Sequence, residues 1–390
     1  MVRVAIVGLG NMGGDHARRI HAGTVEGMTL AAVCDINPAK ITRCLDEIIK
    51  DPSVPAFENT EALFAHPELY DCVIIATPHY AHPEIAIRAF ELKKHVVCEK
   101  PAGVYTKQVR AMMDAAEKAG TVFSMMYNQR TKPMYIKVKQ MIDNGELGAL
   151  KRFSWVITNW YRCQSYHDSG SWRSSWGGEG GGVLMNQDPH QLDMWQWMVG
   201  MPKKVRGFAR FGHYYNIEVE DDVTVYCEYE NGMSATFISS TGEAPGTNRL
   251  EIAGDMGKVV VEDNKITFFK NEISEREFNR TYKGGFGAPR CEAIDIPYEE
   301  VAEKSEHNRI LQNVVDAIEN GAPLVAPGME GIRGLTISNA IHLSSWLDDW
   351  VELPLDEDLY YEKLCERIAS SSYKAEDAFS DKALDVRGTH

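Results

Sequence analysis

The sequence predicts an α/β protein with two domains. The first is a parallel sheet covered by helices on both faces, and the second is an α+β domain with an open, mostly antiparallel sheet. Three observations lead to this expectation. Short apolar runs alternate with helical patterns up to about residue 124, and longer strands of alternating hydrophobicity follow from about residue 150. At 390 residues the chain is also too long for one ordinary core.

The first apolar run, residues 2–7, leads directly into a glycine-rich turn. Gly8, Gly10 and Gly13 match the pattern G-x-G-x-x-G. Gly8 permits a tight turn, Gly10 lets the backbone approach a pyrophosphate, and Gly13 lets the next helix pack on the strand. That helix would offer its first N–H groups, including those of Asn11 and Met12, to the phosphates.

An ordinary glycine turn is the alternative, because this motif alone is weak. Here a strand precedes the turn, a helix follows it, and Asp35 closes a second apolar run about 20 residues further on. Residues 1–124 are therefore expected to form a dinucleotide-binding Rossmann domain.

Asp35 indicates which dinucleotide binds. Its carboxylate can accept hydrogen bonds from both hydroxyls of the adenosine ribose and would repel a 2′-phosphate. Lys40 and Arg43 follow closely and would soften that repulsion. We therefore expect NAD as the cofactor, with NADP less favoured.

The rest of the first domain continues the alternation. Strands are expected over residues 71–78, 95–101 and 121–126, with helices over 83–92 and 107–119. In such sheets ligands bind beyond the carboxyl ends of the strands. The residues expected along this edge beside the cofactor are Thr77, His79, His82, Glu99 and Lys100.

Residues 125–350 are expected to form the substrate-binding and oligomerisation domain. It would hold helices over 133–144, 307–320 and 331–350 and strands over 151–158, 203–211, 222–240 and 249–270, with Asn231-Gly232 as a hairpin turn. Residues 351–390 are polar and are expected to be a C-terminal extension on the surface.

Composition excludes several classes of protein. A formal net charge of −15 argues against nucleic acid or an anionic membrane as partner. No apolar run reaches the roughly 20 residues that cross a bilayer, and the N-terminus already reads as a strand rather than a secretory signal. The eight cysteines lack C-x-x-C spacing, which is typical of reduced thiols and predicts a cytoplasmic protein.

Two segments carry residues suited to proton transfer. Lys100, at the end of a strand on the cofactor edge, could bind a substrate hydroxyl, since partial burial lowers the pKa of a lysine toward working pH. A solvated surface lysine is the alternative. In the segment 178–197, Asn186 and His190 are four residues apart, on one face if the segment is helical. His190 is a natural proton acceptor, although a lone histidine is more often structural.

The same segment begins with four glycines between Gly178 and Gly182. They indicate backbone packed closely against a ligand or cofactor, or else a flexible loop. Upstream, aromatic and polar residues are interleaved in a pattern that suits sugar rings, a partner interface or a core. The aromatic residues are Trp155, Trp160, Tyr161, Tyr166, Trp172 and Trp176, and the polar ones are Arg162, His167, Asp168 and Arg173. We assign Gln129, Trp172 and Arg173 to the cofactor, and Arg162 and Tyr166 to the substrate.

Other chemistries find little support. His79 and His82, with Cys98 nearby, could begin a metal site, but no further ligands stand at supporting spacing, so no metal is expected. A serine hydrolase is disfavoured because the chain has no G-x-S-x-G motif.

Taken together, these motifs resemble the Gfo/Idh/MocA oxidoreductases, which include glucose–fructose oxidoreductase and inositol dehydrogenases. The resemblance covers residues 1 to about 350 and rests on GLGNMG, on EKP at 99–101, on WR at 172–173 and on the glycines, histidine and aspartate of 180–193. It implies Lys100 and His190 as the catalytic pair, a cis peptide bond before Pro101, and a homodimer or homotetramer.

One position departs from that family. Many members carry an aspartate where this chain has Asn186, and an amide can orient a hydroxyl but cannot raise the basicity of His190. The leading interpretation is an NAD-dependent dehydrogenase of a sugar, polyol or glycoside secondary alcohol. Two alternatives stay open: a glycoside-cleaving enzyme that works by transient oxidation, elimination and re-reduction with retained NAD, and a non-catalytic cofactor-binding regulator.

Overall fold

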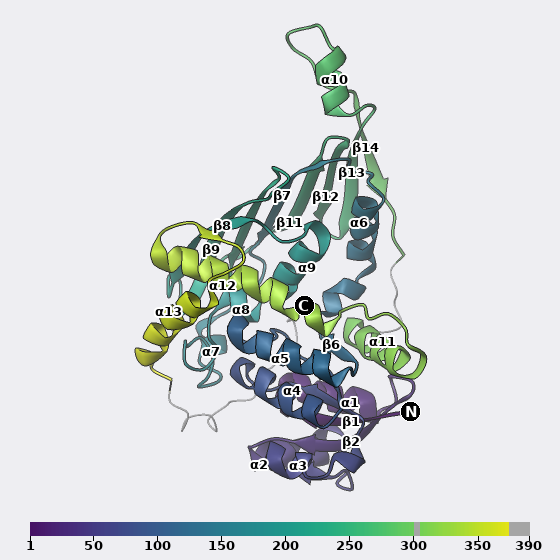
Figure 1. Cartoon of the computed structure of the whole chain (residues 1–390), viewed down its shortest axis with the longest axis vertical. Helices are drawn as coiled ribbons and strands as arrows, with labels where there is room; N and C mark the ends of the chain where they lie inside the picture. The colour runs from purple at the N-terminus through teal and green to yellow at the C-terminus, as the bar shows by residue number, and fades with distance from the viewer. Residues whose placement is uncertain (300–304, 374–390) are drawn as a thin grey trace.

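The computed structural model describes residues 1–299 and 305–373. Two sheets organise the chain: a six-stranded parallel sheet in the N-terminal part and a nine-stranded sheet after it (Figure 1). The predicted fold class is confirmed.

The N-terminal sheet has the strand order β3-β2-β1-β4-β5-β6, and all its pairs are parallel. Its strands are β1 (Val2–Val7), β2 (Met28–Cys34), β3 (Ala56–Phe57), β4 (Cys72–Ile75), β5 (His95–Cys98) and β6 (Phe123–Met125). The helices between them are α1 (Asn11–His21), α2 (Pro38–Arg43), α3 (Thr60–Phe64), α4 (His82–Glu91) and α5 (Thr106–Ala119). Because the strands are parallel, their carboxyl ends form one edge, and this edge carries the candidate site.

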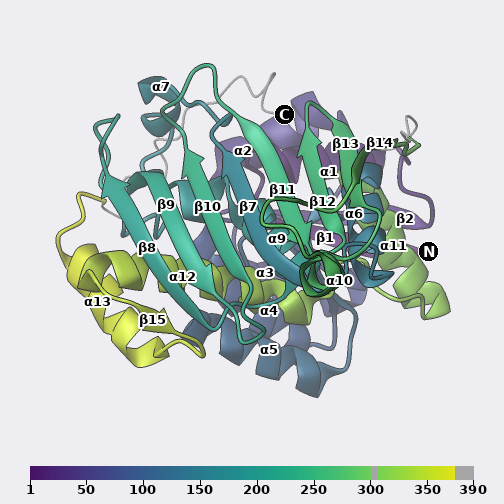
Figure 2. The same ribbon diagram turned by 90° about the horizontal axis from the view of Figure 1, so that it is seen from above.

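The C-terminal sheet is mostly antiparallel, with one parallel pair between β7 and β10. Its strands are β7 (Leu150–Ile157), β8 (Lys204–Phe211), β9 (Glu220–Glu228), β10 (Ser234–Ser240), β11 (Asn248–Gly254), β12 (Gly257–Glu262), β13 (Lys265–Asn271), β14 (Cys291–Ile296) and β15 (Val351–Glu352). The predicted turn at Asn231-Gly232 joins β9 to β10, with Gly232 at a φ of 82°. Figure 2 shows one face of this sheet toward the viewer, with most helices behind it.

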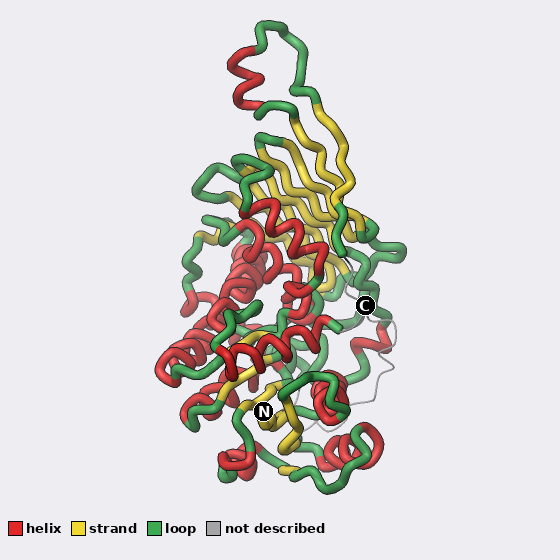
Figure 3. Tube along the Cα trace, turned by 90° about the vertical axis from the view of Figure 1, so that its right-hand side faces the viewer, coloured by secondary structure: helices red, strands yellow, loops and turns green. Residues whose placement is uncertain are grey.

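The helices that follow β6 complete the fold, and Figure 3 shows most helices beside the strands and one projecting past them. They are α6 (Pro133–Asp143), α7 (Gln164–His167), α8 (Val183–Asn186), α9 (Pro189–Val199), α10 (Glu275–Thr281), α11 (Glu306–Asn320), α12 (Gly331–Leu347) and α13 (Glu357–Ala369). The short α10 projects beyond the sheet, whereas α11 lies against the N-terminal part, where Gln312 donates to the carbonyl of Glu26 at 3.2 Å.

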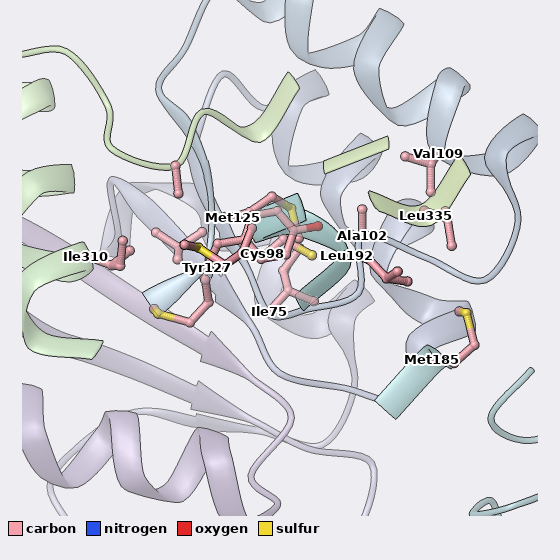
Figure 4. Close-up of a cluster of buried hydrophobic side chains, with 14 of the residues drawn as sticks. Ile75, Cys98, Ala102, Val109, Met125, Tyr127, Met185, Leu192, Ile310 and Leu335 are labelled. Atoms are coloured by element: carbon pink, nitrogen blue, oxygen red, sulfur yellow. The ribbon is translucent and has the colours of Figure 1, made fainter. Parts of the chain in front are cut away.

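One continuous hydrophobic core joins the two parts (Figure 4). Ile75 and Cys98 come from the parallel sheet, Met185 and Leu192 from α8 and α9, and Leu335 from α12. The edge of the parallel sheet that carries the glycine-rich turn is thereby held against the segment that carries Asn186 and His190.

The C-terminal extension is more ordered than a polar surface tail. Residues 351–352 pair with β8, and α13 buries Tyr360 and Leu364 completely. These two side chains are four residues apart, so they lie on one face of the helix. Polar residues surround them in the sequence, so the short apolar pattern was not recognised there. Residues 374–390 of the expected extension lie outside the described residues.

Five cysteines, Cys34, Cys44, Cys72, Cys98 and Cys227, are buried, and all eight have free thiols. Within the described ranges, no helix has both the length and the apolar character that a membrane crossing needs.

Candidate functional site

The glycine-rich turn leaves room for a pyrophosphate at one glycine only. A Cβ on Gly8 would lie 2.6 Å from the carbonyl carbon of Ala76, and one on Gly13 would lie 1.8 Å from the oxygen of Gly8. A Cβ on Gly10 would meet nothing within 4 Å. Gly10 is also the N-cap of α1 and contributes no side-chain cap, so the first N–H groups of the helix are available to an anion. This cradle fits a dinucleotide.

Asp35 is held beside this turn. Its Oδ2 accepts a hydrogen bond from the backbone N–H of Leu9 at 2.6 Å, and its Oδ1 accepts one from Asn37 at 2.8 Å. Leu9 belongs to the glycine-rich turn itself, so the carboxylate is fixed beside that turn. The residues around Gly10 and Asp35 thus fit the expectation of a dinucleotide whose ribose Asp35 would bind.

His82 connects the ends of β4 and β5. Its Nε2 lies 2.7 Å from the carbonyl oxygen of Thr77 and its Nδ1 lies 2.8 Å from that of Pro101. Burial lowers the pKa of His82, so the ring is neutral and one of the two nitrogens donates at a time. His82 is thus a buried side chain that holds Thr77 and Pro101 in position at the edge of the sheet.

His79 reaches from this edge to the glycine loop. Its Nδ1 lies 3.2 Å from the carbonyl oxygen of Glu179, and its ring packs edge-on against Trp172 at 5.7 Å. Among the described residues, no group of three or more His, Cys, Asp or Glu side chains could hold a metal ion.

Glu99 and Lys100 directly follow β5, with Glu99 buried and Lys100 half-buried. Burial raises the pKa of Glu99, but its hydrogen bond to His16, at 2.8 Å, and nearby positive charges lower it overall to about 2. Lys100 donates from Nζ to the carbonyl oxygen of Asn186 at 2.6 Å. Burial lowers the pKa of Lys100, and the charges of Glu99 and Glu179 oppose that shift. The peptide bond before Pro101 is cis, as predicted.

Asn186 and His190 do not share one continuous helix, contrary to the interpretation of their spacing. Asn186 ends α8, the chain turns at Gln187 and Asp188, and His190 lies in the first turn of α9. The amide of Asn186 donates to Glu179 and accepts from the hydroxyl of Tyr166 at 3.0 Å. Its polar atoms are therefore engaged away from His190.

One ring nitrogen of His190 has no partner in the described part of the chain. This atom, Nδ1, is enclosed by the protein and makes no hydrogen bond there. Burial, followed by the charge of Lys100, lowers the pKa of His190 well below 6.5. The ring is therefore neutral near pH 7 and suited to accept a proton.

The glycines of the loop pack against the protein itself. A Cβ on Gly180 would lie 2.2 Å from Val104, and one on Gly182 would lie 2.0 Å from the backbone oxygen of Glu220. Neither a close ligand nor a flexible loop is needed to explain them.

Between Gly178 and Gly180 stands Glu179, a functional candidate that sequence reasoning missed. It is 3% exposed, it accepts from the N–H of Ser174 at 2.6 Å, and burial raises its pKa. The signal that could have found it was a lone carboxylate inside a glycine run.

Tyr166, the predicted substrate residue, is the centre of a hydrogen-bond cluster. Its hydroxyl accepts from Arg173 at 3.0 Å and from Gln187 at 3.1 Å and donates to Asn186. The rings of the other aromatic candidates divide between core and surface: Trp155 and Trp176 are buried, while Tyr161 is 50% exposed. Gln129 is buried just beyond β6, on the same sheet edge.

Two family models match the chain. One, described as the oxidoreductase family with an NAD-binding Rossmann fold, covers residues 2–127, and the GFO/IDH/MocA C-terminal domain covers residues 135–260. Levoglucosan dehydrogenase of Pseudarthrobacter phenanthrenivorans is 26% identical over 338 residues, which are 76% of this chain and 84% of that protein. An inositol 2-dehydrogenase/D-chiro-inositol 3-dehydrogenase of Lactiplantibacillus plantarum is 26% identical over 60% of this chain and 63% of its own length.

Solved structures agree with this assignment. The WlbA dehydrogenase of Chromobacterium violaceum, in complex with NADH and UDP-GlcNAcA, superposes with a TM-score of 0.76 at 25% identity, over 91% of this chain and 96% of that one. A levoglucosan dehydrogenase with NADH and levoglucosan gives a TM-score of 0.74 at 19% identity, over 90% and 99%. The chain is a member of the Gfo/Idh/MocA family of oxidoreductases, with an NAD-binding Rossmann fold in its N-terminal part.

Proposed function

We propose that the chain is an NAD-dependent oxidoreductase that transfers a hydride between nicotinamide and a secondary alcohol of a sugar, polyol or glycoside. The observation that carries the proposal is the meeting of two proton-handling groups at the sheet edge that holds the glycine-rich turn. Lys100 Nζ reaches α8 at 2.6 Å, and His190 offers an unpartnered nitrogen from the start of α9. The named relatives that act on levoglucosan and inositols support this class of substrate.

Bound NAD supplies the hydride acceptor for this oxidation. His190 is neutral and takes the hydroxyl proton at a ring nitrogen. Lys100 binds the same hydroxyl oxygen and stabilises the negative charge that develops on it, because its hydrogen bond to Asn186 preorganises the half-buried side chain. Asn186, held by Glu179 and Tyr166, orients a neighbouring hydroxyl.

We assign the cofactor to one connected surface. The glycine-rich turn holds the pyrophosphate, Asp35 the adenosine ribose, and the ends of β4, β5 and β6 the nicotinamide side. The residues proposed for it are Gly8, Gly10, Asn11, Met12, Gly13, Asp35, Thr77, His79, His82, Glu99, Lys100, Gln129, Trp172 and Arg173.

The test incubates the purified protein with NAD and a panel of sugars, polyols and glycosides, and follows NADH and organic products together. A dehydrogenase yields one ketone for each NADH. Release of an aglycone without net NADH would instead establish the glycoside-cleaving alternative.

Variants of the two proton-handling residues complete the test. Lys100→Met and His190→Ala should each lower kcat by about 10²–10⁴. His190→Ala, which is not part of the proposed cofactor surface, should also leave the Kd for NAD within about threefold of wild type. The exposed His66→Ala is the matched control for the histidine. A loss below tenfold for His190→Ala would remove His190 from the mechanism.

We further propose that the chain assembles as a homodimer or homotetramer through the uncovered sheet face. Phe208, Tyr226 and Ile238 are exposed there on neighbouring strands, at 52%, 39% and 36%. Ile238→Glu should lower the mass measured by light scattering, and an unchanged mass would exclude this face.

A further inference from the structure

Two half-buried arginines on the side proposed for the substrate form no ion pair within the described part of the chain. Arg162 and Arg173 lie over the ring of Tyr166, with their guanidinium carbons 5.2 and 4.8 Å from its centroid. Among the described residues, neither forms an ion pair with a carboxylate. Arg130, by contrast, is paired with both Asp193 and Glu330.

Arg162 has most of its hydrogen-bonding capacity unused. A guanidinium carries five N–H donors, and Arg162 uses one in a hydrogen bond to the carbonyl oxygen of Tyr161 at 3.0 Å. Its Nε is enclosed and has no acceptor among the described residues. A donor in that position is satisfied when a ligand supplies the acceptor.

The surroundings concentrate positive charge. Lys100 faces the same group of residues, and the charges of Arg162 and Arg173 both act on its pKa and on that of Tyr166. Two carboxylates act on Lys100: Glu99, which is bonded to His16, and Glu179, which already accepts from Ser174 and Asn186. Three cations thus lie beside two carboxylates that have partners of their own, in a chain with a formal net charge of −15.

We propose that the substrate is an anionic carbohydrate whose oxyanion, a carboxylate or a phosphate, is bound by Arg162, with Arg173 completing the cationic face. A planar guanidinium matches both oxyanions in a bidentate geometry. The inference rests on the function proposed above, because it places the substrate beside Lys100 and His190. Arg162 carries the test, since Arg173 also borders the cofactor side.

The experiment compares matched substrates with NAD-loaded protein. Glucuronate is paired with glucose, galacturonate with galactose, and glucose 6-phosphate provides the phosphate arm. We expect kcat/KM to be at least tenfold higher for one class of acidic sugar than for its neutral partner, and to fall as salt is raised to about 0.15 M and above. A preference for the uronates would identify the oxyanion as a carboxylate, and a preference for glucose 6-phosphate would identify it as a phosphate.

Arg162→Gln should lower kcat/KM at least tenfold more for the acidic sugar than for the neutral one, and Arg162→Lys should recover part of the difference. Arg280→Gln, an exposed position on the projecting α10, is the matched control for charge and should leave the ratio unchanged. Equal losses on both substrates, or a preference for neutral sugars, would overturn the proposal.

Calorimetric titration of glucuronate and of glucose 6-phosphate into NAD-loaded protein separates this proposal from the proposed function. Binding that is lost in Arg162→Gln supports the anion site even where no sugar is oxidised. Absence of binding for both acids overturns the anion site and leaves oxidation of neutral sugars intact.

Discussion

The side-chain amide of Asn186 donates to the buried carboxylate of Glu179, and Lys100 donates to the backbone oxygen of the same asparagine. Position 186, where the family resemblance led us to expect an aspartate, is thus an amide that already faces a carboxylate. The carboxylate beside residue 186 is therefore that of Glu179, which belongs to the glycine loop.

Asn186→Asp should therefore be poorly tolerated. It would place two carboxylates in contact, which raises the pKa of one of them and destabilises the site by repulsion. We expect kcat/KM to fall at least tenfold. The double variant Glu179→Gln/Asn186→Asp restores one amide and one carboxylate and should recover much of the loss. Asn186→Asp with the activity and pH profile of wild type would show that the two side chains do not interact.

Gly10 and Gly13 should respond differently to the same added methyl group. Gly13→Ala brings a Cβ to 1.8 Å from the oxygen of Gly8 and should lower the melting temperature. Gly10→Ala meets no protein atom within 4 Å and should leave the melting temperature of the cofactor-free protein near wild type. Its Cβ occupies the space that a pyrophosphate needs, so the Kd for NAD should rise at least tenfold. Unchanged NAD affinity in Gly10→Ala would place the cofactor elsewhere.

Asp35→Asn should shift cofactor preference toward NADP. The amide keeps an acceptor for the N–H of Leu9 but removes the charge that repels a 2′-phosphate. The ratio of Kd values for NADP and NAD, measured by fluorescence titration, should fall about tenfold. A wild type that binds NADP more tightly than NAD would refute the electrostatic argument.

Activity should be lost on the acidic side below the ordinary pKa of histidine. Burial lowers the pKa of His190 well below 6.5, and a base must be neutral to work, so kcat/KM falls only as pH drops through that lowered value. Lys100 must be protonated to stabilise the developing negative charge, and burial lowers its pKa from 10.5, so kcat/KM should fall on the alkaline side with a midpoint below 10.5. An acidic limb centred at 6.5 or above would contradict the buried setting of His190.

Stability should fall in acid through Glu99. Its pKa is about 2 in the folded protein against 4.5 in the unfolded chain, so its contribution is complete above pH 4.5 and is lost as pH falls toward 2. The contribution is about 3 kcal/mol. Denaturant unfolding at pH 7 and pH 3 should show a larger loss for wild type than for Glu99→Gln. Equal losses in the two proteins would mean that His16 and Glu99 do not pair.

Patterns among neighbouring residues were sufficient to predict the architecture and to name the glycine-rich turn, Asp35 and Lys100 as site candidates. Continuous apolar strands, the spacing of Gly8, Gly10 and Gly13, and Asp35 predicted the parallel sheet and its cofactor edge. Lys100 followed from its place at the end of a strand. The fold prediction is confirmed because strand period and turn sterics depend on neighbours in sequence. The site roles of Asp35 and Lys100 stay predictions, drawn from the common edge of parallel strands.

The rest depended on contacts between residues far apart in the chain. Lys100 and Asn186 are 86 positions apart, and Tyr166 and Asn186 are 20 apart, so no local pattern relates them. The glycine loop looked like a ligand surface because sequence does not reveal that Val104 and the backbone of Glu220 fill the space beside it. Whether a buried carboxylate faces an amide, a lysine or solvent is decided by the packing of two domains, and that packing placed Glu179 in the site.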